Sequence, residues 1–112
     1  MIIDTHQHVN WLNHDAAWLV AEMDQHHIDV TWLLTWLLIP DEDDPGYHVG
    51  TNPVHARADG THAAMPLADV LDARDRWPLR FIAGYCPSPA QPNAPELFEA
   101  AYYIHGVRVC GE

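Results

Sequence analysis

Basic residues and long hydrophobic runs are both scarce in this chain. Its 112 residues include 5 Lys and Arg against 16 Asp and Glu, a formal net charge of −11. A nucleic-acid phosphate backbone attracts the opposite charge, so we expect no nucleic-acid partner. The longest apolar run, residues 32–39, is far shorter than the roughly 20 residues of a membrane span. We therefore expect no membrane partner either.

Cysteine is rare as well. The chain has 2 cysteines, Cys86 and Cys110, which are too few for a disulfide framework. Each lies near the end of an expected strand, where we expect a small buried thiol. The first residues, Met1-Ile2-Ile3-Asp4, lack the basic segment and apolar stretch of a secretion signal. These features predict a cytoplasmic protein.

Hydrophobic periodicity and turn residues divide the chain into alternating strands and helices. Between the second strand and the second helix, residues 41–60 are polar and aperiodic, which indicates a functional lid or a disordered loop. The expected strands are Ile2–His6, Ile28–Leu38, Leu79–Tyr85 and Val107–Cys110, and the expected helices are Asp15–His27, Thr61–Arg76 and Glu96–His105.

This alternation predicts βαβ units and a parallel sheet, in the α/β class. No glycine-rich phosphate loop follows the first strand, so a (β/α)₈ barrel is favoured over a dinucleotide-binding fold. A complete barrel needs about 250 residues. We therefore expect residues 1–112 to form a single incomplete domain, the N-terminal half of a barrel with about four parallel strands and three helices. Its last strand would expose unpaired backbone groups, which favours a homo-oligomer through the sheet edge.

Histidine is abundant, with 9 residues, and two of them end the first expected strand. Residues two apart on a strand point to the same side, so Asp4, His6 and His8 should share one face. His8 lies at the carboxyl end, where barrel enzymes build their active sites. Two imidazoles placed in this way can both bind one divalent cation, at about 2.0–2.1 Å for zinc. Asp4 would accept a hydrogen bond from a ligand histidine, or fill a polar barrel floor.

Trp11 follows His8 in the loop after the first strand, and so on the expected active-site face. Two interpretations remain open for its indole. It forms a wall of a substrate pocket, or it covers the core as an aromatic lid.

The segment Ile3-Asp4-Thr5-His6-Gln7-His8 resembles the opening strand of the amidohydrolase superfamily, especially its amidohydrolase-related (amidohydrolase-2) branch. The following elements fit the same branch in order. Arg80-Phe81-Ile82-Ala83-Gly84 resembles its third strand and Gly106-Val107-Arg108-Val109 its fourth. The resemblance covers essentially the whole chain, and only the first motif is specific.

The resemblance implies a metal site, with zinc as the expected ion, on a (β/α)₈ barrel. It implies that His6 and His8 are metal ligands, and it places Glu112 where a further ligand follows strand four. An ordinary exposed carboxylate is the other interpretation of Glu112. The remaining ligands and the general base, an aspartate of strand eight, have no counterpart in these 112 residues. We therefore expect the chain alone to be inactive.

Three functions remain open. The first is a metal-dependent hydrolase, or a related decarboxylase, that acts on a small carboxylate, amide or lactone through metal-activated water. The second is a TatD-like metal-dependent deoxyribonuclease, which also opens with a His-x-His strand and has a Gly-Glu pair, as in Gly111-Glu112. The third is a non-catalytic half-barrel that functions only by assembling with another chain.

Overall fold

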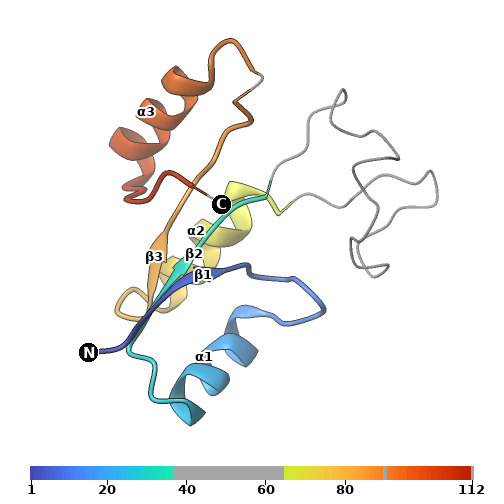
Figure 1. Cartoon of the computed structure of the whole chain (residues 1–112), viewed down its shortest axis with the longest axis vertical. Helices are drawn as coiled ribbons and strands as arrows, with labels where there is room; N and C mark the ends of the chain where they lie inside the picture. The colour runs from blue at the N-terminus through green and yellow to red at the C-terminus, as the bar shows by residue number, and fades with distance from the viewer. Residues whose placement is uncertain (37–64, 90, 112) are drawn as a thin grey trace, which may run out of the picture.

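Three parallel strands alternate with three helices in this α/β protein (Figure 1). The computed structural model describes residues 1–36, 65–89 and 91–111. Its elements are β1 (Ile3–Gln7), α1 (Ala16–Gln25), β2 (Val30–Leu33), α2 (Leu67–Arg76), β3 (Phe81–Ala83) and α3 (Ala94–His105). The expected class and the expected alternation are confirmed. The expected loop at residues 41–60 lies outside the described residues.

The strands form one open sheet in the order β1-β2-β3. Ile3 pairs with Val30 and Thr31 pairs with Phe81, so consecutive strands in the sequence are neighbours in space. Because every pair is parallel, the carboxyl ends of all three strands meet at the same edge. The residues that follow β1, β2 and β3 are therefore the ones that can build a common site.

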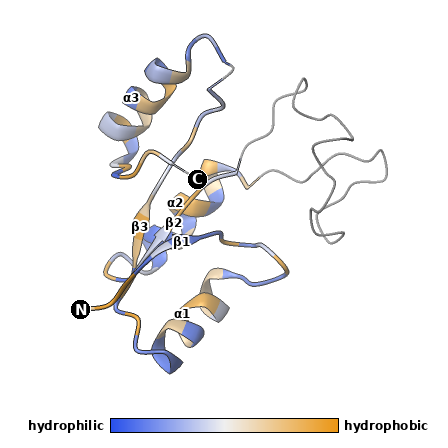
Figure 2. Ribbon diagram, in the orientation of Figure 1, coloured by the Kyte–Doolittle hydropathy of each residue, from blue (hydrophilic) through white to orange (hydrophobic). Residues whose placement is uncertain are grey.

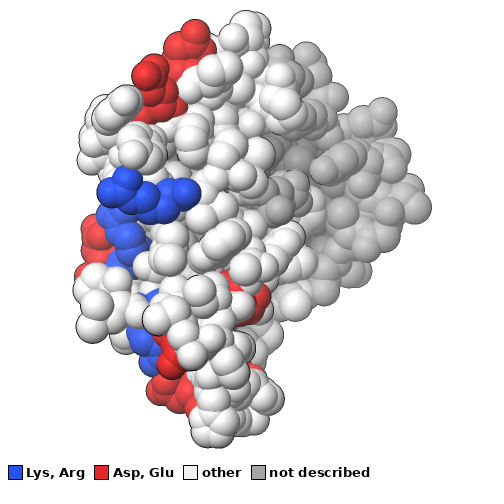
Figure 3. Space-filling model, turned by 60° about the vertical axis from the view of Figure 1, so that its left-hand side comes forward, with Lys and Arg blue, Asp and Glu red and all other residues white. Residues whose placement is uncertain are grey.

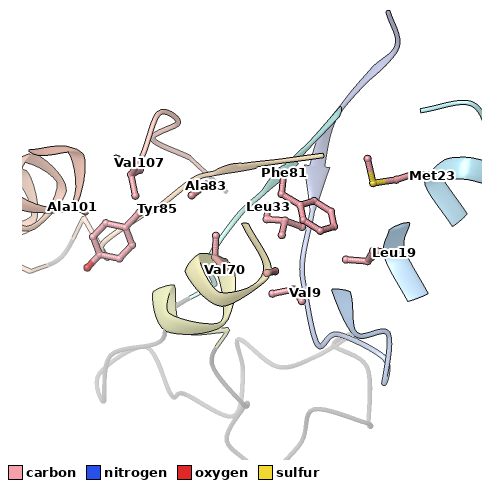
Figure 4. Packing of buried hydrophobic residues seen from close by; sticks show 11 residues of the cluster. Val9, Leu19, Met23, Leu33, Val70, Phe81, Ala83, Tyr85, Ala101 and Val107 are labelled. Atoms are coloured by element: carbon pink, nitrogen blue, oxygen red, sulfur yellow. The ribbon is translucent and has the colours of Figure 1, made fainter. Parts of the chain in front are cut away.

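One hydrophobic cluster joins the sheet to α1 and α2 (Figure 4). Leu33 and Phe81 of the sheet are almost fully buried in it, beside Leu19 of α1 and Val70 of α2. Because these side chains share one cluster, α1 and α2 cover the same face of the sheet. Both helices show hydrophilic and hydrophobic segments in Figure 2, as expected for helices with one buried side.

The expected fourth strand, Val107–Cys110, is present only as a single bridge. Val109 pairs in parallel with Gly84, and the N–H of Arg108 donates to the carbonyl of Ala83 at 2.9 Å. The segment lies beside β3 as expected, but the four-strand prediction is wrong for the described residues. Cys110 is exposed on this segment and Cys86 is half-buried, so the expectation of buried thiols is also wrong.

Two predicted boundaries are wrong, the start of the second helix and the end of the second strand. A pairing between distant residues explains the first. Met65 and Trp36 form an antiparallel bridge, with N–H···O distances of 2.7 and 3.1 Å. This holds Met65 in an extended conformation, so α2 begins at Leu67 after Pro66, and the expected helix from Thr61 does not include Met65. The second strand ends at Leu33 instead of Leu38, and residues 37–64 are not among those described.

None of the helices in the described part of the chain is long and apolar enough to cross a membrane.

Arg80 connects three segments at the amino ends of the strands. Its guanidinium donates to the Asp24 carboxylate at 2.6 Å and to the backbone carbonyls of Ile28 and Asp29, each at 3.1 Å. We expect Arg80→Ala to lower the free energy of unfolding by about 1–2 kcal/mol, measured by urea denaturation. Arg76→Ala is the control, because its exposed ion pair with Asp72 stabilises by only about 0.3–0.5 kcal/mol. Equal losses in both variants would contradict this role of Arg80.

Gly84, the residue after β3, has little space for a side chain. A Cβ at this position would lie 2.5 Å from a methyl group of the buried Leu34 and 3.3 Å from the Cβ of Val109. We expect Gly84→Ala to destabilise the fold by about 1–3 kcal/mol, because the surrounding core has to shift. Gly111→Ala should change the melting temperature little, since nothing lies within 4 Å of its added Cβ. A Gly84→Ala variant as stable as the wild type would show that this space is not tight.

Candidate metal-binding site

His6 lies in β1 and His8 immediately follows its carboxyl end. The two imidazoles lie on the same side of the chain, as the alternation predicts. Their Nε2 atoms are 3.2 Å apart, and the rings meet edge to face at an angle of 82°. His8 is almost fully buried, with 3% of its surface exposed, whereas His6 is exposed. One ring of the pair therefore lies in the interior, and the other lies at the surface.

The backbone of the next strand fixes the orientation of His8. Its Nδ1 lies 3.0 Å from the carbonyl oxygen of Leu34, the residue after β2. A carbonyl only accepts hydrogen bonds, so Nδ1 carries the proton and donates it. In the neutral tautomer with the proton on Nδ1, Nε2 carries the lone pair, and it lies 3.2 Å from Nε2 of His6. Metal-binding histidines are commonly oriented by such a bond from the second ring nitrogen.

The separation of the two Nε2 atoms agrees with the geometry of a metal chelate. Nitrogen–zinc bonds of about 2.0–2.1 Å place two ligands about 3.3–3.4 Å apart at a tetrahedral angle and about 2.9 Å apart at a right angle. The observed 3.2 Å lies between these values. Without an ion, the same distance corresponds to a hydrogen bond from His6 to the lone pair of His8. The two arrangements differ in where the nitrogens point, because a chelate directs both lone pairs at the ion and a hydrogen bond directs one nitrogen at the other.

Asp4 does not follow the simple alternation. The pairing of β1 with β2 shifts register between Asp4 and Gln7, and both of these residues line a cavity against α1. The Asp4 carboxylate accepts a hydrogen bond from the backbone N–H of His6 at 3.1 Å. Asp4 therefore orients the backbone under His6, and the expectation that it shares a face with both imidazoles is corrected.

Two tryptophans lie beside the buried histidine. The Trp11 ring is 5.1 Å from His8 and 6.2 Å from Trp36, and Trp36 is 6.3 Å from His8. Trp36 lies three residues beyond the carboxyl end of β2, the strand next to β1. The two indoles and His8 together form an aromatic wall.

The loop that carries Trp11 has an unusual backbone. Asn10, Leu12 and Asn13 all have positive φ angles, of 61°, 55° and 63°. Such values are uncommon for residues other than glycine, and a branched aliphatic residue such as leucine accepts them with strain. The Asn10 side chain donates to the Asp69 carboxylate of α2 at 2.8 Å, which ties this loop to the neighbouring helix. The strained loop thus holds Trp11 against His8.

No third ligand joins the two histidines within the described residues, where no group of three or more His, Cys, Asp or Glu side chains is arranged to hold a metal. Glu112, the expected additional ligand, lies outside the described residues. His14 does not join the pair, because its ring stacks on Trp18 at 3.5 Å. The described residues therefore bring together two candidate ligands, His6 and His8.

Tyr85 is buried in the core just beyond β3. Burial, with a smaller contribution from Cys86, raises the pKa of its hydroxyl above the ordinary value of 10.0. The phenol therefore stays neutral at physiological pH and packs with Ala101 and Val107, as Figure 4 shows. It contributes to the core that carries α3.

Comparison of the chain with protein-family models, curated proteins and solved structures finds no significant match.

The unequal burial of the two histidines predicts unequal effects on stability without metal. We expect His8→Leu to lower the free energy of unfolding by about 1–3 kcal/mol, because it leaves the buried Leu34 carbonyl without its donor. His8→Asn should cost less, since its amide nitrogen is placed to replace Nδ1, and His6→Ala should change stability by no more than about 0.5 kcal/mol. Urea denaturation in the presence of a chelator tests the order. Equal losses for His8→Leu and His8→Asn would exclude the Leu34 hydrogen bond as the cause.

Proposed function

We propose that this chain is the first half of a (β/α)₈ barrel from a metal-dependent hydrolase, with His6 and His8 as its first metal ligands. The observation that carries the proposal is the convergence of the two Nε2 atoms at 3.2 Å, with the His8 tautomer fixed by the Leu34 carbonyl. This separation fits two ligands of one ion, and the pair lies at the carboxyl end of β1, the end at which barrel enzymes build their active sites.

The arrangement of the helices supports the barrel. α1 and α2 cover one face of the parallel sheet, as in a barrel whose helices are all outside. An open doubly wound sheet carries helices on both faces. His8 and Trp36 follow β1 and β2 at their carboxyl ends, which is where barrel enzymes place their chemistry. The resemblance of residues 3–8 to the amidohydrolase superfamily agrees with the same assignment.

His6 and His8 would hold a divalent ion, zinc by preference, and the Leu34 carbonyl favours the His8 tautomer that can ligate it. Such an ion would lower the pKa of a coordinated water toward about 7 and polarise the substrate carbonyl. Trp11 and Trp36 limit the access of bulk water on one side of His8. The proposed substrate is a small carboxylate, amide or lactone.

One alternative, the deoxyribonuclease, is less well supported. A deoxyribonuclease of the TatD type would bind a polyanion, and the net charge of −11 opposes that. Decarboxylation would use the same metal and the same aromatic wall, so it remains within the proposed class. The general base and further ligands, with Glu112 proposed among them, are not found among the described residues, and we expect the chain alone to show no turnover.

Zinc binding tests the proposal. We expect the wild-type chain to compete with a chromophoric chelator for zinc, and His6→Ala and His8→Ala each to weaken binding by at least about tenfold, because each removes one ligand. His26→Ala is the matched control, since His26 is an exposed residue that pairs with Glu22 at 3.5 Å. Equal zinc affinity in all four proteins would reject His6 and His8 as ligands.

A further inference from the structure

We infer that the cavity enclosed by β1, α1 and β2 binds a small organic ammonium ion. The cavity has a volume of about 150 Å³, and its lining residues all lie between residues 4 and 31, so one βαβ unit builds it. A cavity of this size can hold a molecule of about four to six non-hydrogen atoms. His6 and His8 do not line it, so the inference is independent of the proposed metal site.

The sheet carries polar groups on the face that α1 covers. Asp4 of β1 pairs in register with Thr31 of β2, and both line the cavity. Thr31 is 1% exposed, and its buried hydroxyl has no hydrogen-bond partner in the described part of the chain. Buried hydroxyls are almost always hydrogen-bonded in folded proteins. The hydroxyl therefore indicates a polar guest that the described residues do not supply.

The two carboxylates of the cavity determine the charge of that guest. Asp4 accepts a hydrogen bond from the backbone N–H of His6 through Oδ1, and Glu22 lies 3.5 Å from Nε2 of His26. Neither carboxylate forms an ion pair with an arginine among the described residues. Carboxylates only accept hydrogen bonds, so the guest has to donate them, and an ammonium group offers three donors and a positive charge.

The basic groups nearest to this unit are engaged elsewhere. The three nitrogen atoms of Arg80 donate to the Asp24 carboxylate and to the carbonyls of Ile28 and Asp29. The ammonium group of Met1 lies 3.8 Å from the Asp29 carboxylate. Neither of these aspartates lines the cavity. The described arginines all lie beyond residue 65, in a band along one side of the molecule (Figure 3), so the lining carboxylates keep their charge for a guest.

Apolar side chains complete the cavity and select an organic cation. Leu19 and Met23 are buried on α1, on the side that faces the sheet (Figure 4). Trp18 also lines the cavity and is 41% exposed, so its indole lies where the cavity meets solvent. Aromatic rings attract cations, and the aliphatic side chains suit a short alkyl chain.

A metal ion fits this cavity less well. Its lining includes Asp4, Glu22 and His26, but no three such side chains converge on a metal position within the described residues. The carboxylates and the apolar side chains together therefore favour a short alkylammonium ion over a divalent cation.

Nuclear magnetic resonance of the isotopically labelled full chain tests the site, with a chelator present to keep metals away. We expect n-butylammonium to shift the amide signals of Asp4, Gln7 and Thr31 saturably, with a Kd of about 1 mM, which five non-hydrogen atoms can provide. 1-Butanol and butyrate have chains of the same length without the positive charge. Each should bind at least about tenfold more weakly, because the charge-assisted hydrogen bonds are lost.

Conservative variants separate the cavity from general attraction to an acidic chain. Asp4→Asn and Glu22→Gln should each weaken n-butylammonium binding at least about fivefold, because each removes a charge and keeps an acceptor oxygen. Asp72→Asn is the matched control, since it makes the same charge change at an exposed residue of α2 that pairs with Arg76 at 3.0 Å. Thr31→Val should weaken binding at least about threefold, and Thr31→Ser should retain it.

The other outcomes overturn the inference, provided that the amide spectrum verifies the fold of each variant. The absence of saturable shifts would show that the cavity holds water only. Equal binding of 1-butanol and n-butylammonium would make it an apolar cavity without preference for a cation. An equal loss of affinity in Asp72→Asn and Asp4→Asn would assign the binding to the overall charge of −11.

Discussion

The hydrogen bond between His8 and the carbonyl of Leu34 depends on the parallel pairing of β1 with β2, and the candidate site depends on that bond. The N–H of Leu34 donates to the carbonyl of Gln7 at 2.8 Å, and the carbonyl of Leu34 accepts from His8 at 3.0 Å. Leu34, the residue after β2, thus fixes both the backbone before His8 and the imidazole of His8. Because Nδ1 is engaged in this bond, Nε2 is left for His6 or for a metal ion. The tautomer is therefore a consequence of strand register.

The register shift in β1 explains how the two histidines can converge while Asp4 lies elsewhere. A regular strand would place residues 4, 6 and 8 in one row on one face. The irregularity between Asp4 and Gln7 lets Asp4 and Gln7 both line the cavity against α1. Irregular pairing near a strand end re-aims side chains, and such features are common next to functional sites. Here it also frees the Asp4 carboxylate to accept from the backbone N–H of His6.

Local sequence signals predicted the helices and strands. Features that depend on contacts between residues far apart in the chain could not be predicted. Gly106 ends α3 with a φ of 67°, as expected of a glycine placed after a helix, and Pro95 lies in its first turn. The start of α2 depends on the bridge between Met65 and Trp36, two residues far apart in the chain, and no local pattern encodes it. The His6–His8 pair could be found from its spacing. The Leu34 carbonyl, the acceptor for His8, could not be found in this way. Every residue has a backbone carbonyl, so the sequence does not show which one faces a given side chain.

The charged residues are unevenly distributed along this chain. A uniform charge of −11 would keep copies apart in every orientation, but the charge here is not uniform. The β1–α1–β2 unit has carboxylates without basic residues, whereas Arg74, Arg76, Arg80 and Arg108 offset most of the described carboxylates that follow it. Arg80 joins the two parts, because its guanidinium donates to the Asp24 carboxylate at 2.6 Å and to the backbone carbonyls of Ile28 and Asp29, each at 3.1 Å. Part of the uneven charge is therefore balanced within the fold.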